Sequence, residues 1–107
     1  MSKVIELTVD NYEEHLGKDG THVIKFWEPW CGPCKVFAPV FEEVAESMEG
    51  VLFYTLNADT YGAIAQKHGI RGIPAVIILK KNGADTSERA RFGVITKEDL
   101  TRSIELV

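Results

Sequence analysis

Apolar residues recur at helical spacing over one long segment of the chain, from Lys35 to Met48. The apolar positions are Val36, Phe37, Val40, Phe41, Val44, Ala45 and Met48. Glutamate and serine residues occupy most of the positions between the later ones, as expected for a helix that buries one face. The pattern predicts a long helix with these apolar residues on its buried face, ending at Glu49-Gly50.

The rest of the chain alternates short apolar runs with short helical patterns. Strands are predicted near Lys3–Thr8, Thr21–Trp27, Val51–Leu56, Ala75–Leu79 and Glu88–Phe92. Further helices are predicted near Asp10–Leu16, Thr60–His68 and Lys97–Leu106. Asp10 is the expected N-cap of the first of these helices. Thr96, with Asp99 three residues later, resembles a capping box that opens the last one.

The order of these elements indicates the fold class. Strands alternate with helices up to Pro74, which favours parallel βαβ units. After Pro74 a hairpin signal at Asn82-Gly83 joins two strands directly, which adds an antiparallel pair. We expect one α/β domain over residues 1–107, with a central mixed sheet flanked by about four helices.

Composition narrows the function without naming it. Of the 107 residues 45% are hydrophobic and 26% are charged, which is typical of a globular domain. A net charge of −4 without a Lys/Arg run argues against nucleic acid and acidic membranes as partners. The sequence contains no apolar stretch of membrane-spanning or signal-peptide length, so a soluble cytoplasmic protein is expected.

Both cysteines of the chain, Cys31 and Cys34, lie just before the long helix. The loop they close is too short to contribute much as a structural crosslink, so a disulfide that opens and closes is favoured. A helix N-terminus stabilises the thiolate that attacks disulfides. Two cysteines supply half of a zinc site, and His15, His22 and His68 lie at unrelated spacings. We therefore expect no metal or other cofactor, and three ordinary surface or strand histidines.

Several motifs together resemble the thioredoxin family. They are Phe26-Trp27, Trp30-Cys31-Gly32-Pro33-Cys34-Lys35, Ala38-Pro39, Asn57-Ala58-Asp59, Gly69-Ile70-Arg71-Gly72-Ile73-Pro74 and Phe92-Gly93. The resemblance covers nearly the whole chain and implies a thioredoxin fold and a thiol–disulfide oxidoreductase that reduces protein disulfides. It makes Cys31 the nucleophile that forms a mixed disulfide and Cys34 the cysteine that resolves it. It also implies a monomer, without a bound cofactor, that receives electrons from a separate reductase, commonly an NADPH-dependent flavoprotein.

The same resemblance implies a docking surface for the substrate. Its residues would be Trp30, Gly32, Pro33, Ile73, Pro74 and Gly93. The Ile73–Pro74 bond would be cis and face the cysteines, and the backbone before it would pair with an extended substrate segment.

The chain departs from the family pattern at Lys25, where thioredoxins usually carry a buried aspartate, and at Thr55, where they often carry its lysine partner. Strand parity places Lys25 on the same face as Val23 and Trp27, which points inward. The lysine could extend its ammonium to the edge of the site or pair with Glu28. Alternatively it tunes the thiols: as a cation it would stabilise the Cys31 thiolate, and as a neutral amine it could accept the Cys34 proton.

Two functional alternatives remain, and the first follows from these departures. The Lys25 and Thr55 changes could make the protein an oxidant, an isomerase or a reductase for one dedicated partner. Alternatively the chain could be a binding subunit whose redox chemistry is incidental. Residues 83–89 also form a segment about two residues longer than in common thioredoxins, and we expect it to lengthen an exposed turn.

Overall fold

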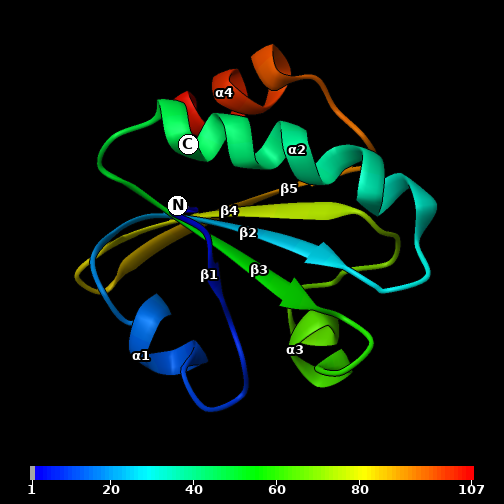
Figure 1. Cartoon of the computed structure of the whole chain (residues 1–107). Helices are drawn as coiled ribbons and strands as arrows, with labels where there is room; N and C mark the ends of the chain where they lie inside the picture. The colour runs from blue at the N-terminus through cyan, green and yellow to red at the C-terminus, as the bar shows by residue number, and fades with distance from the viewer. Residues whose placement is uncertain (1) are drawn as a thin grey trace.

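A five-stranded sheet organises residues 2–107, the part of the chain that the computed structural model describes (Figure 1). Its strands are β1 (Ile5–Glu6), β2 (Gly20–Trp27), β3 (Val51–Asn57), β4 (Ala75–Asn82) and β5 (Asp85–Phe92). Its helices are α1 (Tyr12–Leu16), α2 (Gly32–Ser47), α3 (Gly62–Lys67) and α4 (Lys97–Glu105).

The strand order β1-β3-β2-β4-β5 places β2 at the centre of the sheet. β3 runs parallel to both β1 and β2, whereas β4 runs antiparallel to β2 and to β5. This arrangement confirms the predicted mixed sheet, with parallel βαβ units followed by a hairpin. It also places the carboxyl end of β2, which leads to the cysteines, between the ends of two neighbouring strands.

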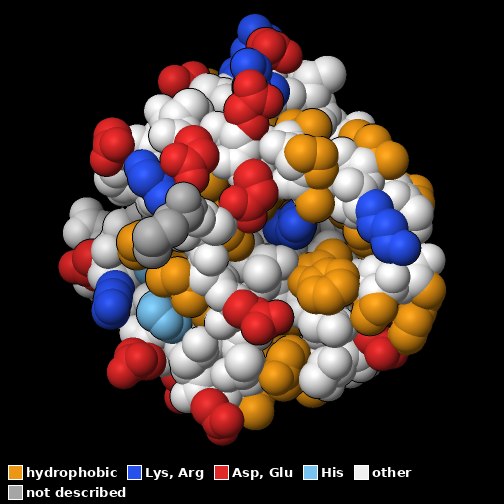
Figure 2. Space-filling view, in the orientation of Figure 1, with side chains coloured by type: hydrophobic (Ala, Val, Ile, Leu, Met, Phe, Trp, Pro, Cys, Tyr) orange, Lys and Arg blue, Asp and Glu red, His pale blue; other side chains and the backbone are white. Residues whose placement is uncertain are grey.

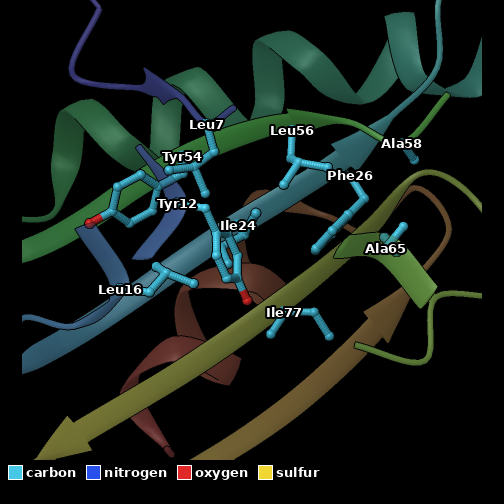
Figure 3. Packing of buried hydrophobic residues seen from close by; sticks show 11 residues of the cluster. Leu7, Tyr12, Leu16, Ile24, Phe26, Tyr54, Leu56, Ala58, Ala65 and Ile77 are labelled. Atoms are coloured by element: carbon cyan, nitrogen blue, oxygen red, sulfur yellow. The ribbon is translucent and has the colours of Figure 1, made fainter. Parts of the chain in front are cut away.

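Helices cover both faces of the sheet, α2 and α4 on one side and α1 and α3 on the other (Figure 1). Two apolar clusters fill the spaces between the layers. Along β2, Ile24 and Phe26 point into the cluster on the α1 side (Figure 3), whereas Val23 points into the cluster beneath α2. The period-2 alternation of a strand produces this division, and it assigns Lys25 to the α2 side together with Val23.

The first strand and helix are shorter than predicted. The strand spans only Ile5–Glu6, and α1 begins at Tyr12 with Asn11 in the N-cap position, so the prediction of Asp10 as the cap is wrong. The segment between them folds on itself instead. The Asn11 side chain accepts the backbone N–H of Thr8 at 2.7 Å, and the Asp10 backbone N–H donates to the Thr8 hydroxyl at 3.2 Å. This local turn delays the start of the helix.

The β4–β5 hairpin turns one residue later than its sequence signal. Asn82 still pairs with Asp85, and the two turn residues are Gly83 and Ala84. Gly83 has φ 63°, which suits the first central position of a two-residue hairpin. The prediction that residues 83–89 lengthen an exposed turn is therefore wrong. Most of this segment belongs to β5 and pairs with β4.

The last helix starts as predicted and ends one residue earlier, at Glu105. The Thr96 hydroxyl accepts the backbone N–H of Asp99 at 3.1 Å, which confirms Thr96 as the N-cap. The Asp99 carboxylate binds the guanidinium of Arg91 on β5 at 2.7 and 3.0 Å. This ion pair lowers the pKa of Asp99 through its hydrogen bonds and fastens α4 to the sheet edge.

His22 lies in strand β2, which agrees with the strand alternative predicted for the histidines, and it is fully buried there. Its Nε2 lies 2.8 Å from the Lys18 carbonyl oxygen and its Nδ1 lies 3.0 Å from the Tyr54 hydroxyl. Because a carbonyl only accepts, Nε2 carries the proton and Nδ1 accepts the Tyr54 hydroxyl. Burial lowers the pKa of His22 and raises that of Tyr54 to about 12.

Candidate active site

The two cysteines occupy the start of α2, at the carboxyl end of the central strand. β2 ends at Trp27, and a turn closed by the Cys31 N–H donating to the Glu28 carbonyl at 3.2 Å leads into the helix. Cys31 is the N-cap residue and Cys34 lies in the first turn. Their sulfurs are joined in a disulfide with the two Cα atoms 5.2 Å apart. The structure therefore confirms the helix-tip position predicted from the sequence.

The helix terminus stabilises negative charge at Cys31. The backbone N–H of Cys34 donates to Cys31 Sγ at 3.1 Å, so one of the free donors of the first turn already faces this sulfur. Pro33, the second residue of the helix, has no N–H to leave unpaired there. Upon reduction, the same donor and the helix dipole favour a thiolate at Cys31.

Exposure distinguishes the two cysteines in the expected order. Cys31 is 8% exposed and Cys34 is 4% exposed. Both residues are buried, and Cys31, at the tip of the helix, is slightly more exposed than Cys34 in the first turn. This order agrees with the roles that the resemblance implies, Cys31 as the attacking thiol and Cys34 as the resolving one.

The predicted docking residues lie in two groups beside the carboxyl end of β2. The first group flanks Cys31 in the sequence. Trp30, before it, is 67% exposed, and Gly32 and Pro33, after it, are also exposed. The second group contains the Ile73–Pro74 bond, which is cis as the resemblance implied. Here the Gly93 N–H donates to the Pro74 carbonyl at 2.9 Å and so joins the Pro74 and Gly93 loops.

The strand pairing places the second group next to the first. Ala75, directly after Pro74, pairs with Phe26, one residue before the end of β2. Phe92, directly before Gly93, pairs with Ala75 from the other side. The fold therefore brings loops from three separate parts of the sequence to one end of the sheet. Ile73 is half-buried and Pro74 is buried, while Gly93 is exposed.

Val36 is an exposed apolar residue that the sequence assigned to the buried face of the helix. It is 62% exposed, so it lies outside the buried face of α2 that Phe37 and Phe41 occupy. Val94, beside Gly93, is 47% exposed. Figure 2 shows hydrophobic side chains gathered on the side where α2 begins, whereas most acidic side chains lie elsewhere on this face.

Lys25 is buried, as strand parity predicted, and is 7% exposed. It pairs in register with Thr55 of β3, so both departures from the family pattern lie side by side. Its Nζ lies 5.4 Å from the centre of the Phe41 ring. Among residues 2–107 the ion pairs do not include Lys25, so the suggested pairing with Glu28 is wrong. Burial lowers the pKa of Lys25, and the negative charge of Glu42 opposes this only in part.

A cavity of about 310 Å³ lies beneath the first turn of α2. It is lined by Lys25, Trp27, Glu28, Pro29, Cys34, Lys35, Ala38 and Thr55. Lys25 and Cys34 therefore share one hollow. Nε1 of Trp27, another residue of the cavity wall, is buried with no hydrogen-bond partner among the described residues. No pattern in the sequence predicted this cavity, because its shape depends on how α2 packs on the sheet.

Residues 2–107 contain neither a cluster of metal-binding side chains nor a helix that could cross a membrane. No group of three or more His, Cys, Asp or Glu side chains is arranged to hold a metal ion. No helix in this part of the chain combines the length and apolar character that crossing a membrane requires.

A cysteine pair at a helix tip, next to a cis-proline loop on a mixed sheet, defines a dithiol–disulfide protein of the thioredoxin fold. Comparison with known proteins agrees with this class. The family model described as Thioredoxin matches residues 3–105, and the chain belongs to the thioredoxin family.

Two curated relatives share part of their length with this chain. An M-type chloroplastic thioredoxin of Spinacia oleracea is 43% identical over 84 residues, which are 78% of this chain and 45% of that protein. A putative thioredoxin 2 of Streptomyces coelicolor is 34% identical over 84 residues, 78% of this chain and 63% of that protein. The matched region thus spans less than two thirds of either relative.

Solved structures show the same fold over almost the whole chain. Chloroplastic thioredoxin z superposes with a TM-score of 0.84 at 23% identity, covering 99% of this chain and 95% of that chain. The thioredoxin Mala s 13 of Malassezia sympodialis also gives a TM-score of 0.84, at 32% identity, covering 99% and 91%. The first likeness supports the fold alone.

Proposed function

We propose that this chain is a thiol–disulfide oxidoreductase that reduces disulfides in other proteins. The observation that carries the proposal is the Cys31–Cys34 disulfide across the first turn of α2, with the Cys34 N–H already directed at Cys31 Sγ. Membership of the thioredoxin family supports the same chemistry. Both cysteines of the chain belong to this one pair.

The reaction takes place in two exchanges. The Cys31 thiolate attacks one sulfur of the substrate disulfide, so that a mixed disulfide forms and the other substrate sulfur leaves as a thiolate. Cys34, once deprotonated, attacks Cys31 Sγ, which closes the Cys31–Cys34 bond and releases the second substrate sulfur. The substrate takes up two electrons and two protons, and the protein is left oxidised.

Regeneration of the dithiol needs two electrons from elsewhere. We infer a separate reductase of the thioredoxin reductase type as the donor, with the chain acting as a monomer without a bound cofactor. A cytoplasmic location is part of the proposal. It is supported by the use of both cysteines in the redox pair, with none left for structural crosslinks.

Substrate docking is proposed on the six residues around the cysteines, namely Trp30, Gly32, Pro33, Ile73, Pro74 and Gly93. The large exposed surface of Trp30 supports this role, since an isolated protein gains nothing by exposing an indole there. An extended substrate segment would pair with the backbone before Pro74, so that main-chain hydrogen bonds bind it with little dependence on sequence. Val36 and Val94 extend the same apolar surface.

Reduction of a peptide disulfide tests the proposal. The wild type should accelerate reduction by dithiothreitol, and Cys31→Ser should abolish the acceleration. Cys34→Ser should stop after the first exchange and accumulate a mixed disulfide through Cys31. A wild type that does no better than dithiothreitol alone, or serine variants that retain the activity, would overturn it in favour of a binding subunit.

A further inference from the structure

Lys25 is a buried residue that forms no ion pair within residues 2–107, and burial of this kind is costly. Its side chain comes from the central strand and its exposed fraction is only 7%. Its Nζ lies 5.4 Å from the centre of the Phe41 ring, which attracts a cation but accepts none of the three N–H bonds as a carboxylate would. A lysine in this position lowers the stability of the fold unless it is neutral or its charge is stabilised by a partner.

The charged groups around Lys25 come from two elements. Glu42 on α2 raises its pKa, but burial has the larger and opposite effect. Glu28, after β2, and Lys35, on α2, line the same cavity without forming an ion pair with it. β3 contributes the neutral side chain of Thr55. No neighbouring group among the described residues thus holds Lys25 in its charged form by direct contact.

The cavity connects Lys25 to only one of the two cysteines. Cys34 lines it together with Lys25, whereas Cys31 does not. A volume of about 310 Å³ holds several water molecules, each of which occupies about 30 Å³ in the liquid. Water in such a hollow can carry a proton between two groups on its wall.

We propose that Lys25 accepts the proton that Cys34 must lose before it resolves the mixed disulfide. This inference rests on the proposed function and adds a proton acceptor to its second exchange. The neutral amine takes the thiol proton through the cavity as the Cys34 sulfur attacks Cys31 Sγ. The Cys31–Cys34 bond forms, and the bond from Cys31 to the substrate breaks. The substrate sulfur leaves with the electron pair, and the Lys25 ammonium then releases its proton to solvent.

The first exchange does not need this help. Cys31 already faces the Cys34 N–H and the N-terminus of α2, which stabilise its thiolate. Cys34 is the more buried sulfur, and burial among apolar groups raises the pKa of a thiol. The acceptor is therefore placed where deprotonation is hardest.

A pH-jump experiment isolates the resolving step. A fluorescent peptide thiol is attached to Cys31 as a mixed disulfide at acidic pH, and its release is followed after a rapid jump to a series of higher pH values. In the wild type the release rate should rise with pH and level off once Lys25 is neutral. In Lys25→Met release should be about 100-fold slower near neutral pH. Its rate should also continue to rise above the pH at which the wild type levels off.

Lys25→Arg separates proton transfer from a simple effect of charge. Arginine remains protonated, so it can attract a thiolate but cannot accept its proton. We expect this variant to be as slow as Lys25→Met. Full activity in Lys25→Arg, or release in Lys25→Met within twofold of the wild type across the pH series, would overturn the inference. Lys25→Gln repeats the measurement in case the other variants do not fold.

The failure of this inference can be told from failure of the proposed function. Formation of the mixed disulfide measures the first exchange, which the Lys25 variants should perform at the wild-type rate. If the wild type forms no mixed disulfide, the proposed function fails. If it does, and release is independent of Lys25, only the inference fails. Lys80→Met, an exposed lysine of β4, removes one charge elsewhere and should leave both steps unchanged.

Discussion

Strand β2 carries two buried basic side chains, and their surroundings differ at its two ends. His22, near the start of the strand, is fully buried and uses both ring nitrogens in hydrogen bonds, to Tyr54 and to Lys18. Lys25, three residues later, is almost as buried, but it forms no ion pair with any residue that the structure describes, and it lines a cavity. The buried polar side chain in the half of β2 far from the cysteines has hydrogen-bond partners for both its nitrogens. The one in the half beside the cysteines has no such partners among the described residues.

The difference shows where this chain departs from optimal packing. Buried polar groups that are fully hydrogen-bonded rigidify a core, whereas incompletely partnered ones lower stability. Departures of this kind are expected at functional sites, where a group must change its protonation or its contacts. Trp27 Nε1, buried without a hydrogen-bond partner in residues 2–107, lies at the same end as Lys25.

The largest expected effect is the loss of disulfide reduction when the cysteine end of β2 is changed by Cys31→Ser. Cys31→Ser should lower peptide-disulfide reduction by more than about 1,000-fold, because the attacking thiolate is gone. It should change the free energy of unfolding of the reduced protein by less than about 1 kcal/mol, since no large cavity is created. Turnover and urea unfolding, measured on the same sample, give both values. A large loss of stability with residual turnover would remove the contrast.

His22→Ala should show the opposite pattern. It leaves the Tyr54 hydroxyl and the Lys18 carbonyl without their partner and opens a cavity in the core. We expect a loss of about 3 kcal/mol in the free energy of unfolding. Reduction per folded molecule should stay within twofold of the wild type. His15→Ala, at a half-buried position on α1, serves as the matched control and should cost less than His22→Ala. Equal losses in the two variants would mean that the His22 hydrogen bonds contribute nothing measurable.

Lys25→Met should stabilise the oxidised protein. The substitution replaces a buried amine that forms no ion pair within residues 2–107 by an apolar side chain of similar length, at the loss of the contact with the Phe41 ring. We expect the free energy of unfolding at pH 7 to rise by about 1 kcal/mol. Urea denaturation of the disulfide form measures it. A loss of more than 1 kcal/mol would show that Lys25 has a favourable partner and that the two ends of β2 are alike.

The smallest expected effects concern how the free energy of unfolding depends on pH. Lys25 and His22 affect this free energy in different pH ranges. The pKa of Lys25 is lowered in the folded state, so above that value the unfolded chain binds more protons and stability rises with pH up to about 10.4. The advantage of Lys25→Met should therefore shrink as the pH rises through this window.

For His22, whose pKa is also lowered by burial, the window lies in acid. Below about pH 6.5 the imidazole of His22 is protonated in the unfolded chain but stays neutral in the folded one until the pH is lower. The free energy of unfolding therefore falls as the pH falls. His22→Ala should reduce this dependence. Free energies of unfolding measured at steps between pH 5 and 10 test both slopes. Identical slopes in the wild type and both variants would contradict the assigned pKa directions.

The sequence predicted much of the fold because local signals and long-range packing agree. The apolar spacing of α2, the helix-tip cysteines and the Thr96 cap all follow from rules that act within one turn or strand. The prediction failed where distant residues decide. His22 packs against Tyr54 of β3, and the exposure of Val36 depends on which side of α2 the sheet covers. Neither relation can be seen within one segment.

The sequence predicted several features of the candidate site, but not the cavity within it. Strand parity alone pointed Lys25 inward, and the family resemblance gave the cis Ile73–Pro74 bond. The cavity that Lys25 shares with Cys34 was not predictable, since it depends on the gap between β2 and the first turn of α2. The register of the β4–β5 hairpin also differed by one residue, because both Asn82-Gly83 and Gly83-Ala84 can form a two-residue turn.

The reduction potential of the Cys31–Cys34 pair tests the central claim most directly. The protein is equilibrated in defined thiol buffers at pH 7, and the fluorescence of Trp27 and Trp30 reports the fraction oxidised. A protein-disulfide reductase should give a value below about −250 mV, at the reducing end of the cytosolic glutathione range. A value near −200 mV or above would mean that Lys25 acts as a fixed cation that stabilises the dithiol. The protein would then be an oxidant or an isomerase.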